Sequence, residues 1–380
     1  MKILMLYEYP PLPGGLSTQA DLLYKGLLHL GVDVHAVHLQ SDTEKEWYYR
    51  WFRPDVAIGV GYWRHTPHLI LQPRQHGVLP VPWLVADGYI ANYLDVLNSL
   101  PLILVTSHWV KEVYVRDGVR EDIIEVLPVG CDTDAFVPRD PDDPMVAAVR
   151  QVFGVAPHQT MILTVGGDAA SKGAQEVMQG LALIKTKAFD WKYVCKVWPQ
   201  PRTTRQNQLD MQLSNELGIQ DRIVYATSIA SRNFMPYLLA ACDIYAAPSR
   251  LEGFGMPQVE ANACGKPVLG IKAMAMLDTL VHGETAFLAG VATEIRISET
   301  ILGPESGYPE GYRMTFDPPR IADYRASAHD IAIYLEQLLA SPELRRRMGE
   351  AGRKRVVEHF DSRVVTKQLL QILSRRLGIS

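Results

Sequence analysis

The chemically most distinctive segment of the chain holds two carboxylates on either side of a glycine-rich turn. It reads PSRLEGFGMPQVEANACGKPVLG, from Pro248 to Gly270. Glu252 and Glu260 are eight residues apart, a little over two helical turns, so they could share a face if a helix began early. Between them, Gly253-Phe254-Gly255 leaves backbone amides unsatisfied at a helix start. Carboxylates suit hydroxyls and amides suit oxyanions, which favours a sugar diphosphate; a plain turn with solvated glutamates is the alternative.

A second candidate is the string VGGDAASKG, from Val165 to Gly173, at a strand end that opens into a helix. Lys172 would offer a diphosphate a point charge, reinforced by the helix N-terminal amides. The string does not match the pattern G-x-x-x-x-G-K-[ST] and lacks the third glycine of a dinucleotide fingerprint, which argues against a P-loop ATPase. The alternative is an ordinary exposed lysine in the first turn of a surface helix.

Gly14-Gly15 stands in PPLPGGLSTQ, directly after the first predicted strand and before a helix that begins near Ser17. Glycines here would let the backbone approach a ligand, and the helix N-terminus would favour an anion. A simple turn is an equally good interpretation of this pair alone.

Each of these three segments follows a predicted strand and precedes a predicted helix. Along the chain, short apolar strands alternate with helical stretches. This alternation predicts an α/β fold of two Rossmann-like, doubly wound domains that face each other across a cleft. A polar, proline-bearing linker, Pro138 to Pro144, divides the series, which predicts domains at 1–150 and 151–360. The predicted strands are 3–7, 32–39, 56–60, 83–86, 102–106, 123–127, 161–165, 193–197, 223–225, 244–247, 267–270 and 286–288.

With these strings, the chain resembles the family-four retaining glycosyltransferases of GT-B fold over nearly its whole length. The resemblance rests on PPLPGG, SHWVKE, EVLPVGCDTDAF, VGGDAASKG and EGFGMPQVEA, of which the last two are the most specific. It implies that the closing segment 361–380, with an amphipathic helix from Ser362 to Leu377, packs back on the first domain, which would hold the acceptor, while the second holds the donor.

The resemblance also implies roles for the candidate residues. Gly14 and Gly15 would lie against the donor phosphate and sugar, and Lys172 would contact the diphosphate. Glu252, with the amides of residues 253–255, would hold the transferred sugar. Glu260 would bind the ribose hydroxyls.

Three positions depart from the family pattern. Gly167 stands where the family usually has arginine, and Arg202, Arg205 or Arg250 could substitute for that cation. Asp87, after PWLVADG, occupies the place of a frequent histidine and would be an acceptor or base. The usual glycine-rich turn after the strand 193–197 is replaced by the residues 198–201, Trp-Pro-Gln-Pro.

The function expected is transfer of a sugar from a nucleotide-diphosphate sugar to a hydroxyl acceptor, with retention at the anomeric carbon, in carbohydrate biosynthesis. Lys172, Glu252 and Asp87 are the candidate catalytic residues. We expect no metal and no cofactor beyond the nucleotide-sugar co-substrate. The alternatives are a nucleotide-sugar epimerase of the same fold and a catalytically degenerate partner subunit.

Net charge and hydrophobic content indicate which classes of binding partner to expect. A net charge of -4 argues against nucleic acid, and 47% hydrophobic residues without a membrane-spanning run indicate a globular, cytoplasmic protein. The run WYYRWFR, from Trp47 to Arg53, suits stacking on a sugar acceptor, peripheral contact with a membrane, or packing of a helix on the sheet. Asp132-Thr133-Asp134 resembles a metal-binding D-x-D but matches a family turn. The segment 290–326 predicts a long irregular insertion, functional or mobile.

Overall fold

The computed structural model of the chain describes residues 1–379, which form two compact units. Unit 1 comprises Met1–Asp132, Arg296–Ala322 and His359–Ser380, and unit 2 comprises Thr133–Ile295 and Asp323–Glu358. The boundary predicted at residue 150 therefore lies inside unit 2. The physical reason is that helix α6 (Pro144–Val152) packs against α9 (Met235–Ala241) of that unit.

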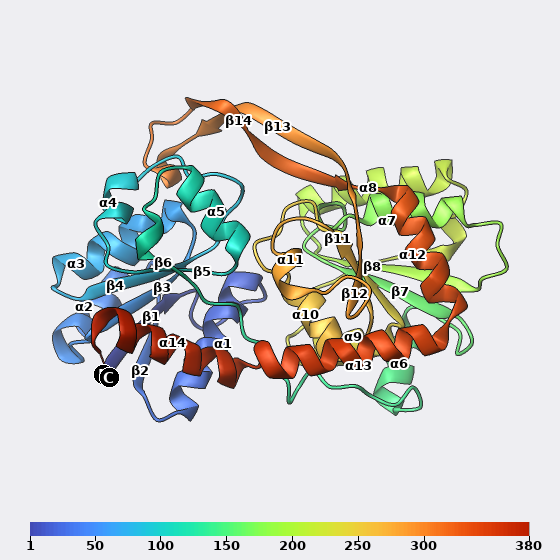
Figure 1. The fold of residues 1–380 in the computed structure, drawn as a ribbon, viewed down its shortest axis with the longest axis horizontal. Coiled ribbons are helices and arrows are strands. Elements are labelled where there is room, and N and C mark those ends of the chain that lie inside the picture. The colour runs from blue at the N-terminus through green and yellow to red at the C-terminus, as the bar shows by residue number, and fades with distance from the viewer. Residues whose placement is uncertain (380) are drawn as a thin grey trace. The chain divides into compact units, whose positions relative to one another are not determined.

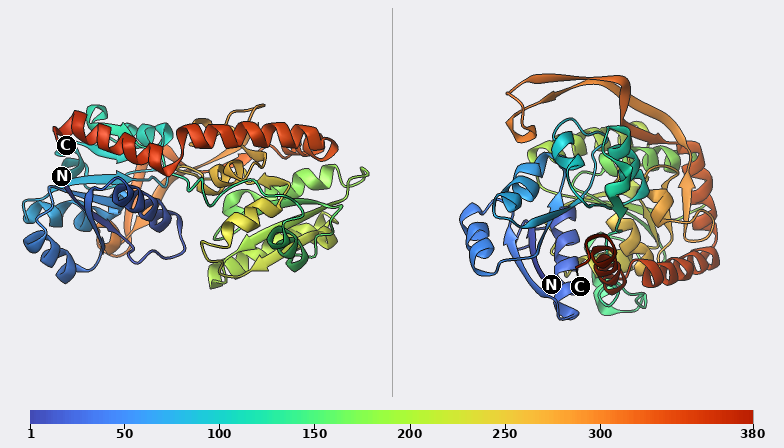
Figure 2. Two further views of the ribbon diagram at one scale, coloured as in Figure 1. Left: turned by 90° about the horizontal axis from the view of Figure 1, so that it is seen from below. Right: turned by 60° about the vertical axis from the view of Figure 1, so that its left-hand side comes forward.

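Unit 1 is built on a six-stranded parallel sheet in the order β2-β1-β3-β4-β5-β6. Its central strands are apolar on both faces because helices cover both sides, as Figure 1 and Figure 2 show. The strands are β1 (Lys2–Tyr7), β2 (Asp33–His38), β3 (Val56–Gly61), β4 (Leu79–Leu84), β5 (Ile103–Val105) and β6 (Ile124–Val126); the main helices are α1 (Gly15–His29), α2 (Asp42–Trp51), α5 (His108–Arg116) and α14 (Ser362–Leu377).

Unit 2 repeats the plan with the strand order β12-β11-β10-β7-β8-β9, again parallel (Figure 1). The strands are β7 (Thr160–Val165), β8 (Trp191–Val197), β9 (Ile223–Thr227), β10 (Ile244–Ala246), β11 (Val268–Ile271) and β12 (Ala286–Ala289); the main helices, besides α6 and α9, are α7 (Ala174–Leu183), α8 (Pro201–Glu216), α10 (Met256–Ala263), α12 (Ala328–Ala340) and α13 (Pro342–His359). All predicted strands are present, with ends shifted by a few residues, so the doubly wound α/β fold is confirmed.

The closing helix α14 packs against α1 in unit 1. The contact is close, because a Cβ at Gly26 of α1 would lie 2.1 Å from the hydroxyl oxygen of Thr366. At the far end of the helix, Arg375 forms an ion pair of 2.9 Å with Glu125 of β6.

The insertion 290–326 is not the irregular loop that its composition predicted. It forms a two-stranded hairpin of β13 (Val291–Leu302) and β14 (Tyr312–Ala326). Alternating β-branched and polar residues, as in the run 291–301, pair readily even though several glycines and prolines lie at the turn and Pro318 and Pro319 lie within β14. The tip lies in unit 1, where the Tyr308 hydroxyl donates to the Ala91 carbonyl at 2.6 Å; the base lies in unit 2, where the Tyr324 amide donates to Arg250 O at 2.9 Å.

Two loops at the carboxyl ends of β7 and β10 touch each other in unit 2. Gly173 makes this approach possible: its φ is 81°, and a Cβ there would stand 2.3 Å from the carbonyl oxygen of Pro248. Beside it, the Arg250 amide donates to the Ser171 carbonyl at 3.0 Å. The strings 165–173 and 248–255, far apart in the sequence, therefore form one surface.

Gly173→Ala should destabilise the protein by more than about 2 kcal/mol, because it combines left-handed strain with a collision against backbone. The matched control is Gly154→Ala, since Gly154 has a φ of 61° but nothing within 4 Å of its Cβ position. The control should cost only about 1 kcal/mol from strain. Chemical denaturation measures both; equal losses would show that the two loops do not need their close contact.

Candidate active site

Lys172 and Glu252, 80 residues apart in the sequence, form an ion pair at the surface shared by the two loops. Lys172 Nζ lies 2.6 Å from Glu252 Oε2, and the two side chains are 22% and 15% exposed. Lys172 ends the short turn (Ala170–Lys172) before α7, and Glu252 precedes α10. The structure thus brings together a cation and a carboxylate beside two helix N-termini.

A buried ion pair beneath this surface holds the second loop in place. The Arg250 guanidinium donates to Glu176 of α7 at 2.9 Å, and the two side chains are only 11% and 7% exposed. Burial raises the pKa of the Glu176 carboxyl, although Arg250 acts in the opposite direction. Removing one partner of such a pair leaves a charge buried without its counterion, which is strongly destabilising.

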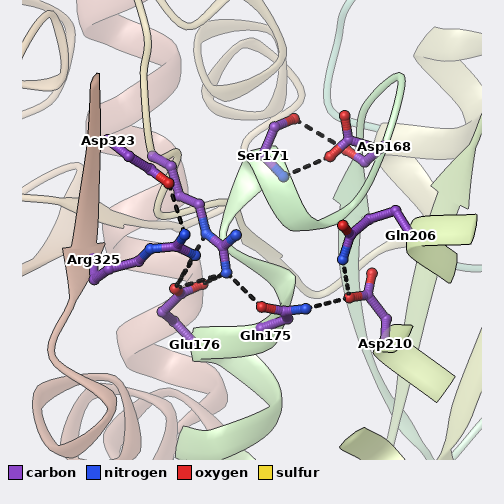
Figure 3. A network of polar contacts seen from close by, with 9 residues as sticks. Asp168, Ser171, Gln175, Glu176, Gln206, Asp210, Asp323 and Arg325 are labelled. Atoms are coloured by element: carbon purple, nitrogen blue, oxygen red, sulfur yellow. Dashed lines mark hydrogen bonds and ion pairs between the residues drawn. The ribbon is translucent and has the colours of Figure 1, made fainter. Parts of the chain in front are cut away.

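The network continues on both sides of this pair, as Figure 3 shows. Gln175 accepts from Arg250 at 2.7 Å and donates to Asp210 of α8 at 2.7 Å. On the other side, Arg325 of β14 donates to Glu176 at 3.3 Å and pairs with Asp323 at 2.7 Å. The base of the hairpin is therefore part of the support of the loop that carries Glu252, a connection that the sequence pattern did not reveal.

Arg250 is paired with Glu176 and therefore does not replace the cation that the resemblance led us to expect at Gly167. Of the other two candidates, Arg205 lies exposed on α8, and the side chain of Arg202 is outside the described part of the structure. A Cβ at Gly167 would contact the ring of Trp198 at 3.5 Å. The departures at Gly167 and at residues 198–201 therefore lie against each other.

Glu260 is buried on α10, with an exposed fraction of 3%, and forms an ion pair of 2.7 Å with Arg232. Arg232 also lies over the ring of Phe136, at 4.6 Å from its centroid. Because α10 begins at Met256, Glu252 precedes the helix, and the shared helical face considered for the two glutamates does not form. Arg232, which sequence reasoning missed, orients the Glu260 carboxylate.

The glycine-rich turn between the glutamates presents backbone rather than side chains. Gly255 has a φ of 90°, a left-handed conformation that favours glycine, whereas the Met276 side chain near its Cβ position could move aside. The Phe254 side chain is buried at 5% exposure. Any contribution of residues 253–255 to ligand binding therefore comes from their amides at the start of α10.

Gly14 and Gly15 lie in unit 1, after β1 and at the N-terminus of α1. In contrast to Gly255, neither lies in the left-handed region, since Gly14 is extended with a φ of 167°, and a Cβ at either would meet nothing within 4 Å. The preceding loop is fixed by Ser17, whose hydroxyl accepts from the Leu12 amide at 2.9 Å. Nothing in the fold itself requires glycine at these two positions.

Asp87 lies three residues beyond β4, at the same carboxyl edge of the sheet as Gly14. Its Oδ2 accepts from the Arg64 guanidinium, whereas its Oδ1 is buried without a hydrogen-bond partner among residues 1–379. Burial raises the pKa of Asp87, and Arg64 opposes that rise. Arg64 is a further residue that sequence reasoning did not single out.

The aromatic run of unit 1 lies at the opposite edge of the sheet. Trp47 and Trp51 of α2 are 52% and 57% exposed and stack at 5.0 Å between ring centroids. Lys2, at the start of β1, donates to the Phe52 carbonyl at 3.2 Å, which places this end of the run at the amino edge, away from Gly14. Peripheral membrane contact through these rings stays a prediction; no helix among the described residues is long and apolar enough to cross a bilayer.

Among the described residues, two further groups of titratable side chains drew attention: the histidines near Arg64 and the pair Asp132 and Asp134. Burial lowers the pKa of His65 to about 4, with Arg64 adding to the effect. Asp132 and Asp134 lie where the chain passes from unit 1 to unit 2. Across residues 1–379, no group of three His, Cys, Asp or Glu side chains is arranged to hold a metal ion.

The chain is similar in sequence to several named glycosyltransferases. The chain is 26% identical over 293 residues to the MMP alpha-(1->4)-mannosyltransferase of Mycolicibacterium hassiacum, which covers 77% of this chain and 58% of the relative. It is 27% identical over 219 residues to the D-inositol 3-phosphate glycosyltransferase of Xylanimonas cellulosilytica, covering 57% and 51%. The chain thus spans between half and three fifths of the length of these curated relatives.

The fold has close structural neighbours. The crystal structure of Anabaena Alr3699/HepE in complex with UDP and glucose matches with a TM-score of 0.74 and 16% identity, over 99% of this chain and 100% of that one. The family described as "Glycosyl transferases group 1" matches residues 147–303, which include Lys172, Glu252 and Glu260. The match to this family and the shared fold confirm the resemblance to glycosyltransferases and the GT-B fold predicted from the sequence.

Proposed function

We propose that the protein transfers a sugar from a nucleoside-diphosphate sugar to a hydroxyl acceptor, with retention of anomeric configuration and without a metal ion. The observation that carries this proposal is the Lys172–Glu252 pair beside the N-termini of α7 and α10. The cation and the helix amides suit a diphosphate, and the carboxylate suits sugar hydroxyls. The relatives support it, since one is named a mannosyltransferase and one neighbour was solved with UDP and glucose.

In the proposed reaction, the bond between the anomeric carbon and the diphosphate oxygen breaks while the acceptor oxygen bonds to that carbon on the same face. The departing diphosphate takes the acceptor's proton, so no protein nucleophile is needed. Lys172 and the helix N-termini stabilise the charge that develops on the diphosphate. Glu252 and Glu260 hold the sugar and the ribose, and catalysis rests on positioning.

The proposal is tested by incubating the protein with a panel of nucleotide sugars and following the donor. Slow release of nucleotide and free sugar supports a transferase, whereas an altered sugar on an intact nucleotide would indicate an epimerase. A donor that stays unchanged would indicate a binding subunit without turnover. The nucleoside diphosphate that raises the melting temperature most identifies the base, because a ligand that binds only the native state stabilises it.

Substitutions of Glu252 and of Glu260 should affect turnover and nucleotide affinity differently. Glu260→Ala should weaken binding of the nucleoside diphosphate by about 1 to 3 kcal/mol, the range for losing a hydrogen bond to a charged group. Glu252→Gln should lower turnover far more than it lowers affinity for the bare nucleotide. Calorimetry and initial rates measure the two effects; parallel losses in both variants would remove the separate assignments to ribose and sugar.

Gly15→Ala should leave the melting temperature unchanged, since the fold has room for a methyl group and helix starts tolerate alanine. It should nevertheless lower turnover at least about tenfold if a donor group approaches this backbone, since misplacing reacting groups is costly. Ser17→Ala is the control for loop order, because it removes the hydroxyl that fixes the loop. A Gly15→Ala enzyme of full activity would refute the role of this turn.

The effect of substituting Asp87 distinguishes a mechanism in which the diphosphate is the base from one in which Asp87 is. If the diphosphate is the base, Asp87→Asn should cost a modest factor, but if Asp87 is a general base the loss should reach about 10² to 10⁴-fold. In the second case the activity of the natural enzyme would fall as the pH drops through the raised pKa of Asp87, because protonation removes the base. Proton NMR of the product gives an independent answer: an inverted anomeric centre would overturn retention.

A further inference from the structure

Lys196 is an enclosed lysine at the carboxyl end of β8, with an exposed fraction of only 3%. Its backbone carbonyl accepts from the Gly166 amide at 3.1 Å, so it adjoins the loop that leads to Lys172. Among the residues that the structure describes, no carboxylate and no hydrogen-bond acceptor pairs with its ammonium group. A lysine in this state is uncommon, since buried charges are normally paired.

The polar network of unit 2 cannot serve Lys196, because it lies on the other face of the sheet. Side chains alternate along a strand, so Tyr193 and Cys195 face away from Lys196. Those two residues lie on the side of α8, where the Tyr193 hydroxyl bonds Thr164 at 2.7 Å and the charge of Asp210 acts on Cys195. The absence of a partner for Lys196 therefore follows from the strand register.

The face of the sheet that carries Lys196 also carries Tyr245. Val194, two residues before Lys196, is in register with Leu163, which is in register with Tyr245 of β10. Burial raises the pKa of Tyr245 well above its usual value, and the charges of Glu252 and Glu260 raise it further. Lys196 thus lies at the carboxyl edge, on the face of the residue that both carboxylates influence, and open sheets of this kind bind ligands at that edge.

The cations near the proposed diphosphate site differ in whether a carboxylate already neutralises them. Lys172 is already neutralised by Glu252, and Arg250 by Glu176. A diphosphate brings about two negative charges or more, which these internally paired cations do not balance. Among the described residues, no carboxylate offsets the positive charge of Lys196, and its side chain is far less exposed than that of Lys272 at the same edge.

We propose that Lys196 binds the phosphate groups of the donor nucleotide, as a second cation beside Lys172. The inference rests on the proposed function, since it assumes a nucleoside-diphosphate donor. Lys196 holds no counterion within the protein because the ligand provides it. An unpaired, enclosed lysine lowers the stability of the protein without nucleotide, a trade-off between stability and function that is common at binding sites.

The test compares Lys196→Met with Lys192→Met. Methionine keeps an unbranched apolar stem, and Lys192 lies on the same strand and the same face, but at the amino end, where its ammonium bonds the Asp221 carbonyl at 3.4 Å. We expect Lys196→Met to weaken binding of UDP or GDP, whichever the natural protein binds, by tenfold to a hundredfold, the usual range for a charged hydrogen bond. Lys192→Met should bind normally, and Lys196→Arg should restore part of the affinity.

Stability gives a second readout that a purely structural lysine would not produce. Without nucleotide, Lys196→Met should unfold at the same temperature as the natural protein or higher, because it removes an unpaired buried charge. Normal nucleotide affinity in a folded Lys196→Met would overturn the inference while leaving the proposed function intact. A natural protein that binds no nucleoside diphosphate in calorimetry would instead overturn the proposed function and this inference together.

Discussion

The candidate donor surface depends on the buried ion pair between Arg250 and Glu176. Glu252 lies on a loop without regular secondary structure, and such a loop has a defined position only if something rigid beneath it is bonded to it. The pair joins the loop to α7, whose first turn follows Lys172, so one interaction sets the positions of both charged groups. Because the pair is almost fully enclosed, its removal would disturb the loop as well as the stability of the unit.

The hairpin β13–β14 is part of the same support. Arg325 shares Glu176 with Arg250, and the Tyr324 amide bonds Arg250 O, so β14 runs directly against the loop of Glu252. In unit 1, a Cβ at Gly88, the residue after Asp87, would stand 2.8 Å from the carbonyl oxygen of Ile321 in β14. Within each unit, the part of the hairpin that belongs to that unit therefore contacts a segment next to a candidate site residue.

The glycines of the two units illustrate how fold and function can be separated. Gly173 is required by its positive φ and by the backbone oxygen 2.3 Å from its Cβ position, and Gly255 is required by its φ of 90°. Gly14 and Gly15 satisfy no such requirement. The role proposed for them at the start of α1 is therefore separable from the needs of the fold.

The strands and helices, and the positions of the candidate residues along them, could be predicted from the sequence because strand period, helix starts and glycine turns are local properties of the chain. Two doubly wound sheets, the strings around Lys172 and Glu252, and the turn at Gly14 were all predicted in this way. The hairpin was missed because its strands are stabilised by pairing with each other and by contacts with distant residues, not by composition. The partners of Arg250, Glu260 and Asp87, and the enclosure of Lys196, were decided only by tertiary structure: each depends on which residues the parallel strand order brings to one edge and one face of a sheet.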